Sequence, residues 1–304
     1  MTKTDVYLYG QILGTHSFLL EDGFLRPDQY SEISGHFFLP GGETGTAATV
    51  LASLGVSVRM DGTKIGPGAA PMLRRFYENK TVDLSSLSFD EQQEDVIDYV
   101  VIAGLTRSPM GRFRHLHEST VPYWNPPREA DILNCHAAAI DPFFGEDSER
   151  AAKLCVKHGV PYVTIDCRHD RYLHQHAAVN VVSKECLEND YPCRTADEVM
   201  PLLQETADGL VIITSGGGDM LYARRSRPVR RMKPFPVTVK STLGAGDTFK
   251  AGCVYGLLKG FDDDRLVRFA SACAGIAISR FPLPLYPPRL EEVQRLILEG
   301  GKAT

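Results

Sequence analysis

The sequence predicts an α/β fold in which helices flank a central, mainly parallel β-sheet that carries a small β lid. Between about residues 131 and 214, segments typical of buried strands alternate with helical segments. Such alternation favours a parallel sheet covered on both faces. Residues 16–39 alternate loosely between apolar and polar side chains, as exposed strands do. From residue 245 onward the pattern is mainly helical.

Local signals place the elements of the first half. Turn signals at 22–23 and 27–28 divide 16–39 into two lid strands. Gly55 is a good C-terminal cap for a helix expected at 43–54. The expected elements are a strand at 5–13 ending near Gly10, the two lid strands, a helix at 43–54, a strand at 56–59, a helix at 70–78 and a strand at 96–103. The lid therefore combines two segments, at about 16–39 and 96–104.

The second half predicts a more regular alternation. Strands are expected at 131–135, 161–165, 179–182, 210–214 and 236–239, and helices at 148–158, 196–207, 245–258, 263–279 and 289–298. No shift in composition marks two independent halves. We therefore expect one domain over residues 1–304.

Composition limits the classes of protein. The chain is 43% hydrophobic and 23% charged with a net charge of -5, which argues against nucleic-acid binding. The N-terminus MTKTDVYLYG is too polar for a signal peptide, and no run of 18 apolar residues predicts a membrane span. Its seven cysteines include no CxxC pair, which favours buried, reduced thiols. These features predict a cytoplasmic protein.

The segment KSTLGAGDTF at 240–249 carries the chemistry. Gly244 and Gly246 let the backbone turn sharply, and the N–H groups of Gly244, Ala245 and Gly246 would form an anion hole at the start of a helix. Asp247 beside them could accept a proton from a substrate hydroxyl while a phosphoryl group arrives. The alternative is a simple helix cap after a glycine-rich turn.

At this segment the sequence resembles the PfkB/ribokinase family of carbohydrate kinases. Residues 242–249 look like the second family signature, D-T-x-G-A-G-D-x-F, with Ser241 at the place of its usual first Asp. The resemblance implies a ribokinase-like fold, Asp247 as catalytic base and Gly244 to Gly246 as anion hole. It also implies ATP and Mg²⁺ as cofactors and a small sugar-like substrate.

The implied substrate residues depart from the family pattern. Residues 41–48 (GGETGTAA) match the first signature, G-G-x-x-x-N-x-A, except that Thr46 replaces the sugar-binding Asn. Thr15 stands where the family commonly has an Asp. The implied substrate-binding residues are Thr15, Gly41, Gly42, Thr46 and Arg112. His16 and Glu43, like Arg112, are candidates to supply the missing polar contacts.

The resemblance also implies a nucleotide site. Ser215, Gly216, Gly217 and Gly218 follow a strand as the family's nucleotide loop does, although a hairpin turn explains them too. Ser183-Lys184-Glu185 is similar to ketohexokinase-type members, as are the GPG at 66–68 and Thr242-Leu243. Ser183 is expected at the nucleotide, with Glu185 and Asp166 near magnesium through water, or else as solvated loop carboxylates.

Several alternatives stay open at this point. Lys250, three residues after Asp247, either flanks a negatively charged substrate or is solvated. The chain is expected to be a kinase for a hydroxyl acceptor. A non-catalytic sensor of the same fold and a nucleoside or pyrimidine kinase are the alternatives. Apolar lid side chains (Phe18, Leu20, Phe37 and Phe38) predict a homodimer joined through the lids.

Overall fold

The computed structural model describes residues 3–300 apart from 22, 25–26 and 120. The strands of the larger sheet are β1 (Thr4–Gly10), β4 (Val58–Gly62), β5 (Val82–Asp83), β8 (Cys135–Ile140), β9 (Tyr162–Ile165), β10 (Val179–Val182), β11 (Leu210–Ile213), β12 (Met220–Ala223) and β13 (Arg230–Met232). The smaller sheet contains β2 (Leu13–Leu20), β3 (Ile33–Gly41), β6 (Ile97–Ala103) and β7 (Thr106–Gly111).

The helices lie mainly between the strands along the chain. They are α1 (Gly42–Ser53), α2 (Ala70–Tyr77), α3 (Phe113–Glu118), α4 (Glu129–Leu133), α5 (Glu146–Lys157), α6 (Tyr172–Gln175), α7 (Lys184–Asp190), α8 (Ala196–Thr206), α9 (Ala245–Leu258), α10 (Asp263–Ile278) and α11 (Leu290–Gly300). None of these described helices is both long and apolar enough to cross a bilayer.

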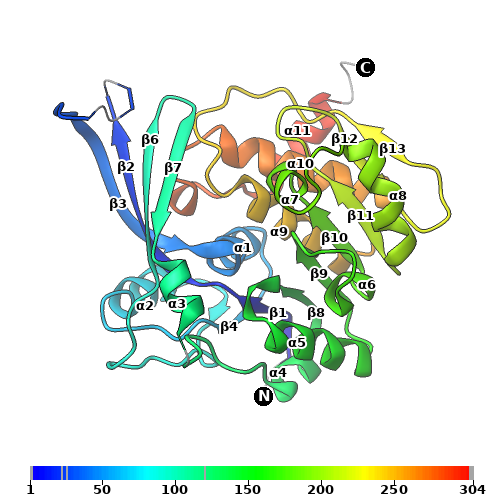
Figure 1. The fold of residues 1–304 in the computed structure, drawn as a ribbon, viewed down its shortest axis with the longest axis horizontal. Helices are drawn as coiled ribbons and strands as arrows, with labels where there is room; N and C mark the ends of the chain where they lie inside the picture. Colours follow the sequence, from blue (N-terminus) through cyan, green and yellow to red (C-terminus); the bar gives the residue numbers. More distant parts are fainter. Residues whose placement is uncertain (1–2, 22, 25–26, 120, 301–304) are drawn as a thin grey trace.

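The larger sheet has the strand order β13-β12-β11-β10-β9-β8-β1-β4-β5 within the described chain (Figure 1). The pairs from β11 through β5 are parallel, and β12 and β13 add an antiparallel edge. This arrangement confirms the predicted, mainly parallel sheet. The carboxyl ends of the parallel strands, where open sheets of this type bind ligands, face the same edge.

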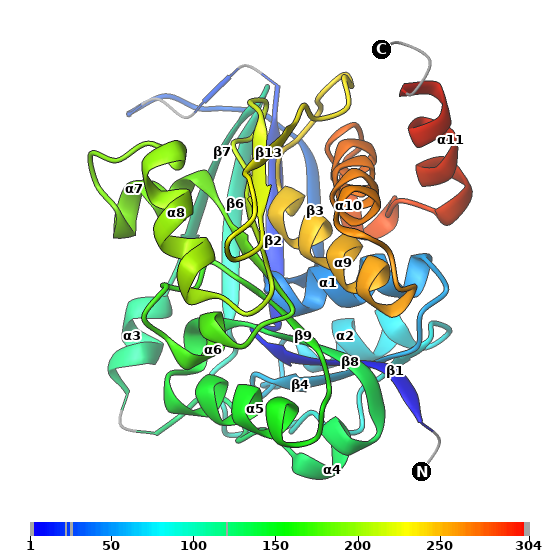
Figure 2. The ribbon, with the colours of Figure 1, turned by 90° about the vertical axis from the view of Figure 1, so that its right-hand side faces the viewer.

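Two layers of helices cover this sheet, and the side chains of β1 show why. Val6 and Leu8 belong to a core shared with α1, α9 and α10, whereas Tyr7 and Tyr9 belong to a second core under α5. Successive side chains of a strand point to opposite faces, so one apolar strand supplies both cores. Figure 2 shows α5 to α8 on one side of the strands and α1, α9 and α10 on the other.

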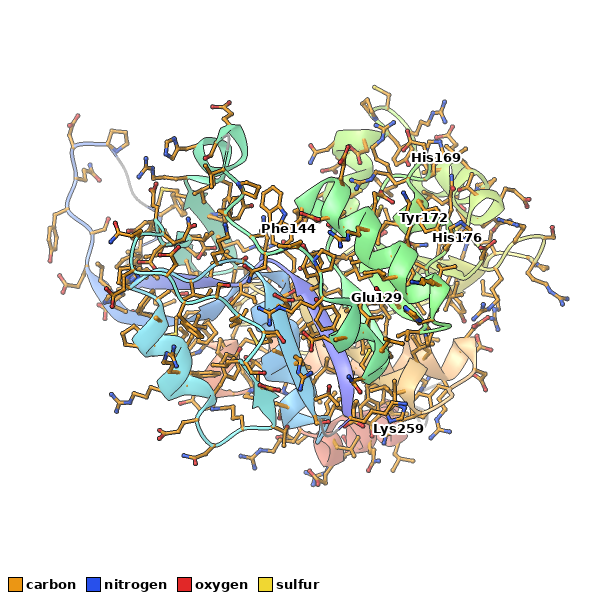
Figure 3. All side chains as sticks on the ribbon, turned by 90° about the horizontal axis from the view of Figure 1, so that it is seen from below. Glu129, Phe144, His169, Tyr172, His176 and Lys259 are labelled. Atoms are coloured by element: carbon orange, nitrogen blue, oxygen red, sulfur yellow. The ribbon has the colours of Figure 1, made fainter. Side chains whose placement is uncertain are left out.

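The second core is closed by aromatic rings on the underside of the molecule. The Phe144 ring stacks on Trp124, with centroids 4.9 Å apart, and meets Tyr9 edge-on at 5.5 Å. Figure 3 shows Phe144 and Glu129 in this region. Glu129 accepts a hydrogen bond from the Lys157 ammonium at 2.8 Å and so links α4 to α5.

The smaller sheet, ordered β3-β2-β6-β7 among the described strands, is the predicted lid and stands to one side of the larger sheet (Figure 1). It includes β7, which the sequence did not predict, because β7 alternates poorly and most of its side chains are exposed. β3 extends to Gly41 and β7 to Gly111, beyond the predicted ends of the two lid segments at 39 and 104. The lid thus reaches the beginning of α1, where the glycine pair lies.

Two predicted strands are wrong. Residues 131–135 are mostly helical, and the strand follows at Cys135–Ile140. The observed strand is rich in alanine, a poor strand former, so its strand signal was weak. Asp131 in the helix before it is buried, and its carboxylate accepts a hydrogen bond from the Arg59 guanidinium at 2.7 Å. Residues 236–239 are irregular rather than extended into a ladder, since Pro234 and Pro236 cannot donate backbone hydrogen bonds.

Candidate active site

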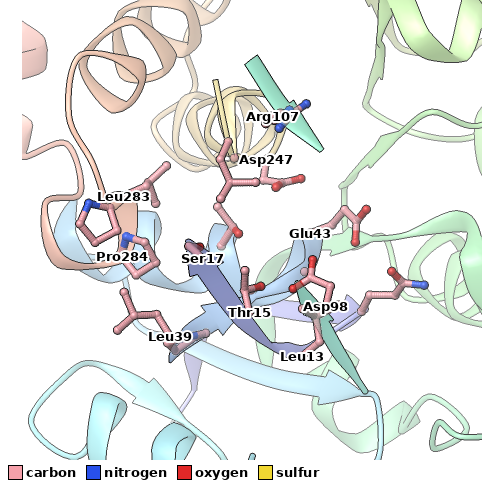
Figure 4. A pocket seen from close by; sticks show the side chains of 18 of the residues that line it. Leu13, Thr15, Ser17, Leu39, Glu43, Asp98, Arg107, Asp247, Leu283 and Pro284 are labelled. Atoms are coloured by element: carbon pink, nitrogen blue, oxygen red, sulfur yellow. The ribbon is translucent and has the colours of Figure 1, made fainter. Parts of the chain in front are cut away.

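A cavity of about 430 Å³ lies between the lid and the start of α9. Its wall contains residues from both ends of the chain: Gln11, Leu13, Thr15, Ser17, Leu39 to Glu43, Thr46, Asp98, Arg107, Phe113, Phe143, Leu243, Gly244, Asp247 and Phe281 to Pro284. Figure 4 shows the side chains of Glu43, Asp98 and Asp247, from three different elements, around this space. The size suits a small molecule.

The turn before α9 needs its first glycine. Gly244 has φ +78°, in the left-handed region, and a Cβ there would lie 3.2 Å from both Thr46 Cγ2 and Leu283 Cδ1. The Ala245 N–H donates to the Thr242 carbonyl at 3.2 Å, within the turn itself. Of the three predicted anion-hole donors, Ala245 therefore already has a partner, although the bond is long.

Asp247 lies in the first turn of α9 and lines the cavity. Burial raises the pKa of its carboxyl to about 6; the positive charge of Lys250 opposes this shift and the charge of Asp141 adds to it. Glu43, from the first turn of α1, lines the same cavity, and burial together with the charge of Asp247 raises its pKa to about 8. At neutral pH the pair is therefore arranged with Asp247 ionised and Glu43 protonated.

Lys250 is neither solvated nor part of the cavity wall, so both readings of this residue are wrong. Its side chain is fully buried and its ammonium is paired with the carboxylate of Asp141, which is also buried. The other oxygen of Asp141 accepts hydrogen bonds from the Thr44 hydroxyl at 2.8 Å and the Gln11 N–H at 3.1 Å. This buried network joins α9, α1 and the end of β1 beneath the cavity.

The glycine pair is required by close contacts. A Cβ on Gly41 would lie 1.9 Å from Thr15 Oγ1, and a Cβ on Gly42, which has φ +77°, would lie 2.4 Å from the Gln11 carbonyl oxygen. Thr15, Gly41, Gly42 and Thr46 all line the cavity. The structure thus brings together four of the five predicted substrate residues.

Arg112, the fifth, is not among the described residues that line the cavity. Its guanidinium is exposed and pairs with Glu94, at 2.5 Å. Arg107, on the neighbouring strand β7, lines the cavity instead and donates to the Thr242 carbonyl at 3.2 Å. His16 also lies off the cavity wall, where its imidazole contacts that of His36 at 2.9 Å.

Sequence reasoning missed Asp98. It lies on β6 opposite Thr15 of β2, and the Thr15 hydroxyl hydrogen-bonds to its carboxylate. Burial raises the pKa of Asp98 to about 6. A lone carboxylate inside the apolar run VIDYVVIA was the available signal, since an acid on a half-buried strand needs a reason.

The predicted nucleotide loop lies apart from the cavity wall. Residues 215–218 form a turn between the antiparallel strands β11 and β12 that is exposed at its three glycines, with the Gly218 N–H donating to the Ser215 carbonyl at 2.9 Å. The hairpin interpretation of this segment is therefore correct, and it does not exclude nucleotide binding. A Cβ on Gly216 or Gly217 would meet no described atom within 4 Å.

Asp166 and Ser183 follow neighbouring parallel strands and bind each other. Ser183 donates its N–H to one oxygen of Asp166 at 2.6 Å and its hydroxyl to the other at 3.0 Å. Burial raises the pKa of Asp166, which has the unusual φ of +49°. Its charge contributes to the raised pKa of Asp247, so the two carboxylates lie within electrostatic reach. Glu185 is exposed.

The cysteines agree with the expectation of reduced thiols. All seven are free, and all except Cys193 are buried. Burial raises the pKa of the Cys135 and Cys167 thiols to about 12. A thiol with such a pKa is a poor nucleophile, and no described cysteine lines the cavity.

Comparisons of sequence connect the chain to sugar kinases. The family model for pfkB family carbohydrate kinases matches residues 3–282. The 5-dehydro-2-deoxygluconokinase of Bacillus licheniformis is 30% identical over 113 residues, which are 37% of this chain and 34% of that protein. The 1-phosphofructokinase of Haemophilus influenzae is 31% identical over 118 residues, 36% of this chain and 38% of that protein. The matches thus span little more than a third of these relatives.

Solved structures share the fold along the whole chain. A proposed ribokinase from Agrobacterium tumefaciens has a TM-score of 0.87 at 17% identity, with 99% of both chains covered. Ribokinase from Arabidopsis thaliana, complexed with ribose and ATP, has a TM-score of 0.79 at 15% identity over 98% of this chain and 99% of that one. A proposed ribokinase II from E. coli, in complex with ATP and Mg²⁺, has a TM-score of 0.78 at 18% identity, with 97% of this chain and 99% of that chain covered.

These structural likenesses establish a ribokinase-like fold. The sequence match extends over nearly all of the larger sheet, the lid and the cavity between them. This protein belongs to the pfkB family of carbohydrate kinases.

Proposed function

We propose that this protein transfers the γ-phosphoryl group of ATP to a hydroxyl group of a sugar or sugar-like small molecule. The observation that carries the proposal is the place of Asp247. Its carboxylate lies in the first turn of α9, on the wall of a cavity closed by the lid, one residue after the glycine turn. A base and a set of helix N-terminal donors are thereby available at one point.

The chemistry follows from this arrangement. Asp247 takes the proton of the acceptor hydroxyl while the oxygen of that hydroxyl bonds to the γ-phosphorus. The bond between the γ-phosphorus and the oxygen that bridges it to the β-phosphate breaks, and ADP leaves. The N–H groups of Gly244, Ala245 and Gly246 would stabilise the negative charge on the transferring group. The Ala245 N–H would exchange its 3.2 Å bond to the Thr242 carbonyl for this contact.

The residues near the site fit a nucleotide with Mg²⁺. ATP would lie along residues 215–218 and Ser183, at the carboxyl ends of β10 and β11, and reach the start of α9. Mg²⁺ usually keeps several water ligands and binds phosphate oxygens, so it would bridge the phosphates of the nucleotide. Asp166 and Glu185 are proposed to hold its water ligands. The bound ion would neutralise phosphate charge.

Binding and turnover test this proposal separately. We expect calorimetry to detect ATP binding in the presence of Mg²⁺, and we expect a screen of sugars, polyols, nucleosides and amino sugars to find an acceptor that raises ADP production. Titration of ATP in EDTA is the matched control, because loss of the metal should weaken phosphate binding. Absence of ATP binding would remove the main support for a kinase. Binding without turnover on any acceptor would favour the sensor alternative, and turnover on nucleosides alone a nucleoside kinase.

We also propose a homodimer joined through the outer faces of the lids. That face carries stacked rings: His16 lies 4.2 Å from Phe38 and 5.3 Å from Tyr99, and Phe18 lies 4.7 Å from His36, between centroids. Tyr99 is 44% exposed. Phe37 does not share this face, because its ring packs against Phe281 beside the cavity, and Leu20 is buried.

The dimer makes a simple prediction for the mass in solution. Light scattering at micromolar concentration should give twice the chain mass of 33.6 kDa. Tyr99→Asp should give a monomer, because a second copy would bury the introduced charge. Asp170→Asn, a change on an exposed loop, should leave the dimer intact. A monomeric wild type would refute the proposal.

A further inference from the structure

The Asp98 carboxylate has one oxygen without a partner. Oδ1 is buried and makes no hydrogen bond to any described residue, while the carboxylate accepts one from the Thr15 hydroxyl. Both residues line the cavity. A buried carboxylate oxygen left unpaired carries a desolvation cost, which a donor on a bound molecule would remove.

The direction of the internal hydrogen bond defines what that donor must be. An ionised carboxylate can only accept, so the single hydroxyl proton of Thr15 must point at Asp98. Thr15 Oγ1 then offers only lone pairs to the cavity. A Cβ on Gly41 would lie 1.9 Å from this oxygen, so the backbone at the glycine pair encloses it closely. Thr15 Oγ1 on β2 and Asp98 Oδ1 on β6 are thus two neighbouring acceptors, and they match two neighbouring donors on a bound molecule.

The charges of the wall limit the ligand further. Of the described residues that line the cavity, Glu43, Asp98 and Asp247 are acidic and Arg107 alone is basic. The Arg107 guanidinium is exposed and already donates to the Thr242 carbonyl. Lys250, whose charge also acts on Asp247, is buried against Asp141 and does not line the cavity. Glu43 is protonated at neutral pH, but the ionised Asp98 and Asp247 still outnumber Arg107 on the wall. A carboxylate or phosphate on the acceptor would therefore meet mostly like charge.

We infer that Asp98 and Thr15 together bind two adjacent hydroxyl groups of an uncharged polyol, and that the acceptor site disfavours sugar acids and sugar phosphates. This inference rests on the kinase function proposed above for its acceptor, but its contacts can be measured without turnover. Asp98 is a specificity-determining residue in this account. The remaining wall, from Leu39, Phe113 and Leu283, supplies apolar contact to the carbon skeleton.

The test is direct binding by calorimetry, with ATP absent. The panel contains ribose, fructose, glucose, sorbitol and myo-inositol as neutral ligands, 2-deoxyribose as a ligand that lacks one hydroxyl, and gluconate, glucuronate and fructose 1-phosphate as anions. We expect the wild type to bind at least one neutral ligand at least 10-fold more tightly than any anion. Asp98→Asn should weaken that binding about 10–100-fold, since a charge-assisted hydrogen bond is lost.

Controls separate this role from a structural one. Asp170→Asn removes an equal charge from an exposed loop and should leave binding unchanged. Asp98→Asn should also narrow the preference for neutral ligands over anions, which simple loosening of the lid would not do. Thr15→Val should weaken binding as well, since it removes one acceptor.

The binding results test the polyol site, and the turnover results test the kinase function. Tighter binding of the anions, no binding of any neutral ligand, or an Asp98→Asn variant with wild-type affinity and selectivity would each overturn the inference. Asp98-dependent binding of a neutral polyol that is never phosphorylated would keep the inference and remove the kinase function.

Discussion

Asp247→Asn is expected to lower kcat by about 10²-fold or more while ATP binding and the unfolding temperature stay nearly unchanged. Asn has almost the shape of Asp but cannot accept a proton at neutral pH, and positioned bases contribute about 10²–10⁴-fold. The structure removes the main alternative role, because the residue that caps α9 is Gly244 and Asp247 lies within the first turn. Steady-state kinetics with the acceptor found by the screen would measure the change.

Glu43 provides the matched control for this substitution. It lies across the same cavity, and its pKa is raised to about 8 by burial and by the charge of Asp247, so Gln imitates its protonated form. Glu43→Gln should therefore lower kcat far less than Asp247→Asn. Near-full turnover in the Asp247→Asn variant, or an equal loss in both variants, would contradict the assignment of the base.

The pH dependence of turnover gives a second check on the same carboxylate. Burial raises the pKa of Asp247 to about 6, so its basic form is lost as the pH falls through that value. The kcat of the wild type should fall below about pH 6, and the residual turnover of Asp247→Asn should lack this acidic limb. A wild-type profile that stays flat down to pH 4 would not fit Asp247 as the base.

Lys250→Met is expected to reduce the free energy of unfolding by about 3–5 kcal/mol, because it leaves the buried Asp141 carboxylate without its cation. The Thr44 hydroxyl and Gln11 N–H still bind that carboxylate, but they carry no full positive charge. Chemical denaturation would measure the loss. The folded fraction should also show a higher kinetic pKa for Asp247, whose ionised form Lys250 favours.

An exposed ion pair gives the control for Lys250. Lys184 and Glu188 lie 3.5 Å apart on the surface of α7, and both side chains are more than 60% exposed. Lys184→Met should change the unfolding free energy by no more than about 0.5 kcal/mol. In the double variant Lys250→Met with Asp141→Asn, part of the stability should return, because no unpaired charge remains. A loss of less than about 1 kcal/mol for Lys250→Met alone would contradict a structural role for the pair.

The local features of the site were determined by the sequence. The glycine turn, Asp247 in the first turn of α9 and the glycine pair at 41–42 depend on residues within a few positions of one another, so their spacing was enough to predict them. The parallel sheet was predictable for a similar reason, since short continuous runs rich in Val, Ile and Leu mark buried strands locally. The alanine-rich strand Cys135–Ile140 lacked that signal, so the strand was predicted too early in the chain, at 131–135.

Only the tertiary structure decided which side chains meet. Lys250 and Asp141 lie 109 residues apart in the chain, and no local pattern pairs them. Asp98 reaches Thr15 through the register between β6 and β2, and the cavity receives Arg107 from β7 rather than Arg112 a few residues later. Strand register fixes which face of a strand each side chain occupies, and a shift of one residue reverses it. Register is set by packing of the whole lid, so the partners of a charged side chain could not be read from its neighbours in sequence.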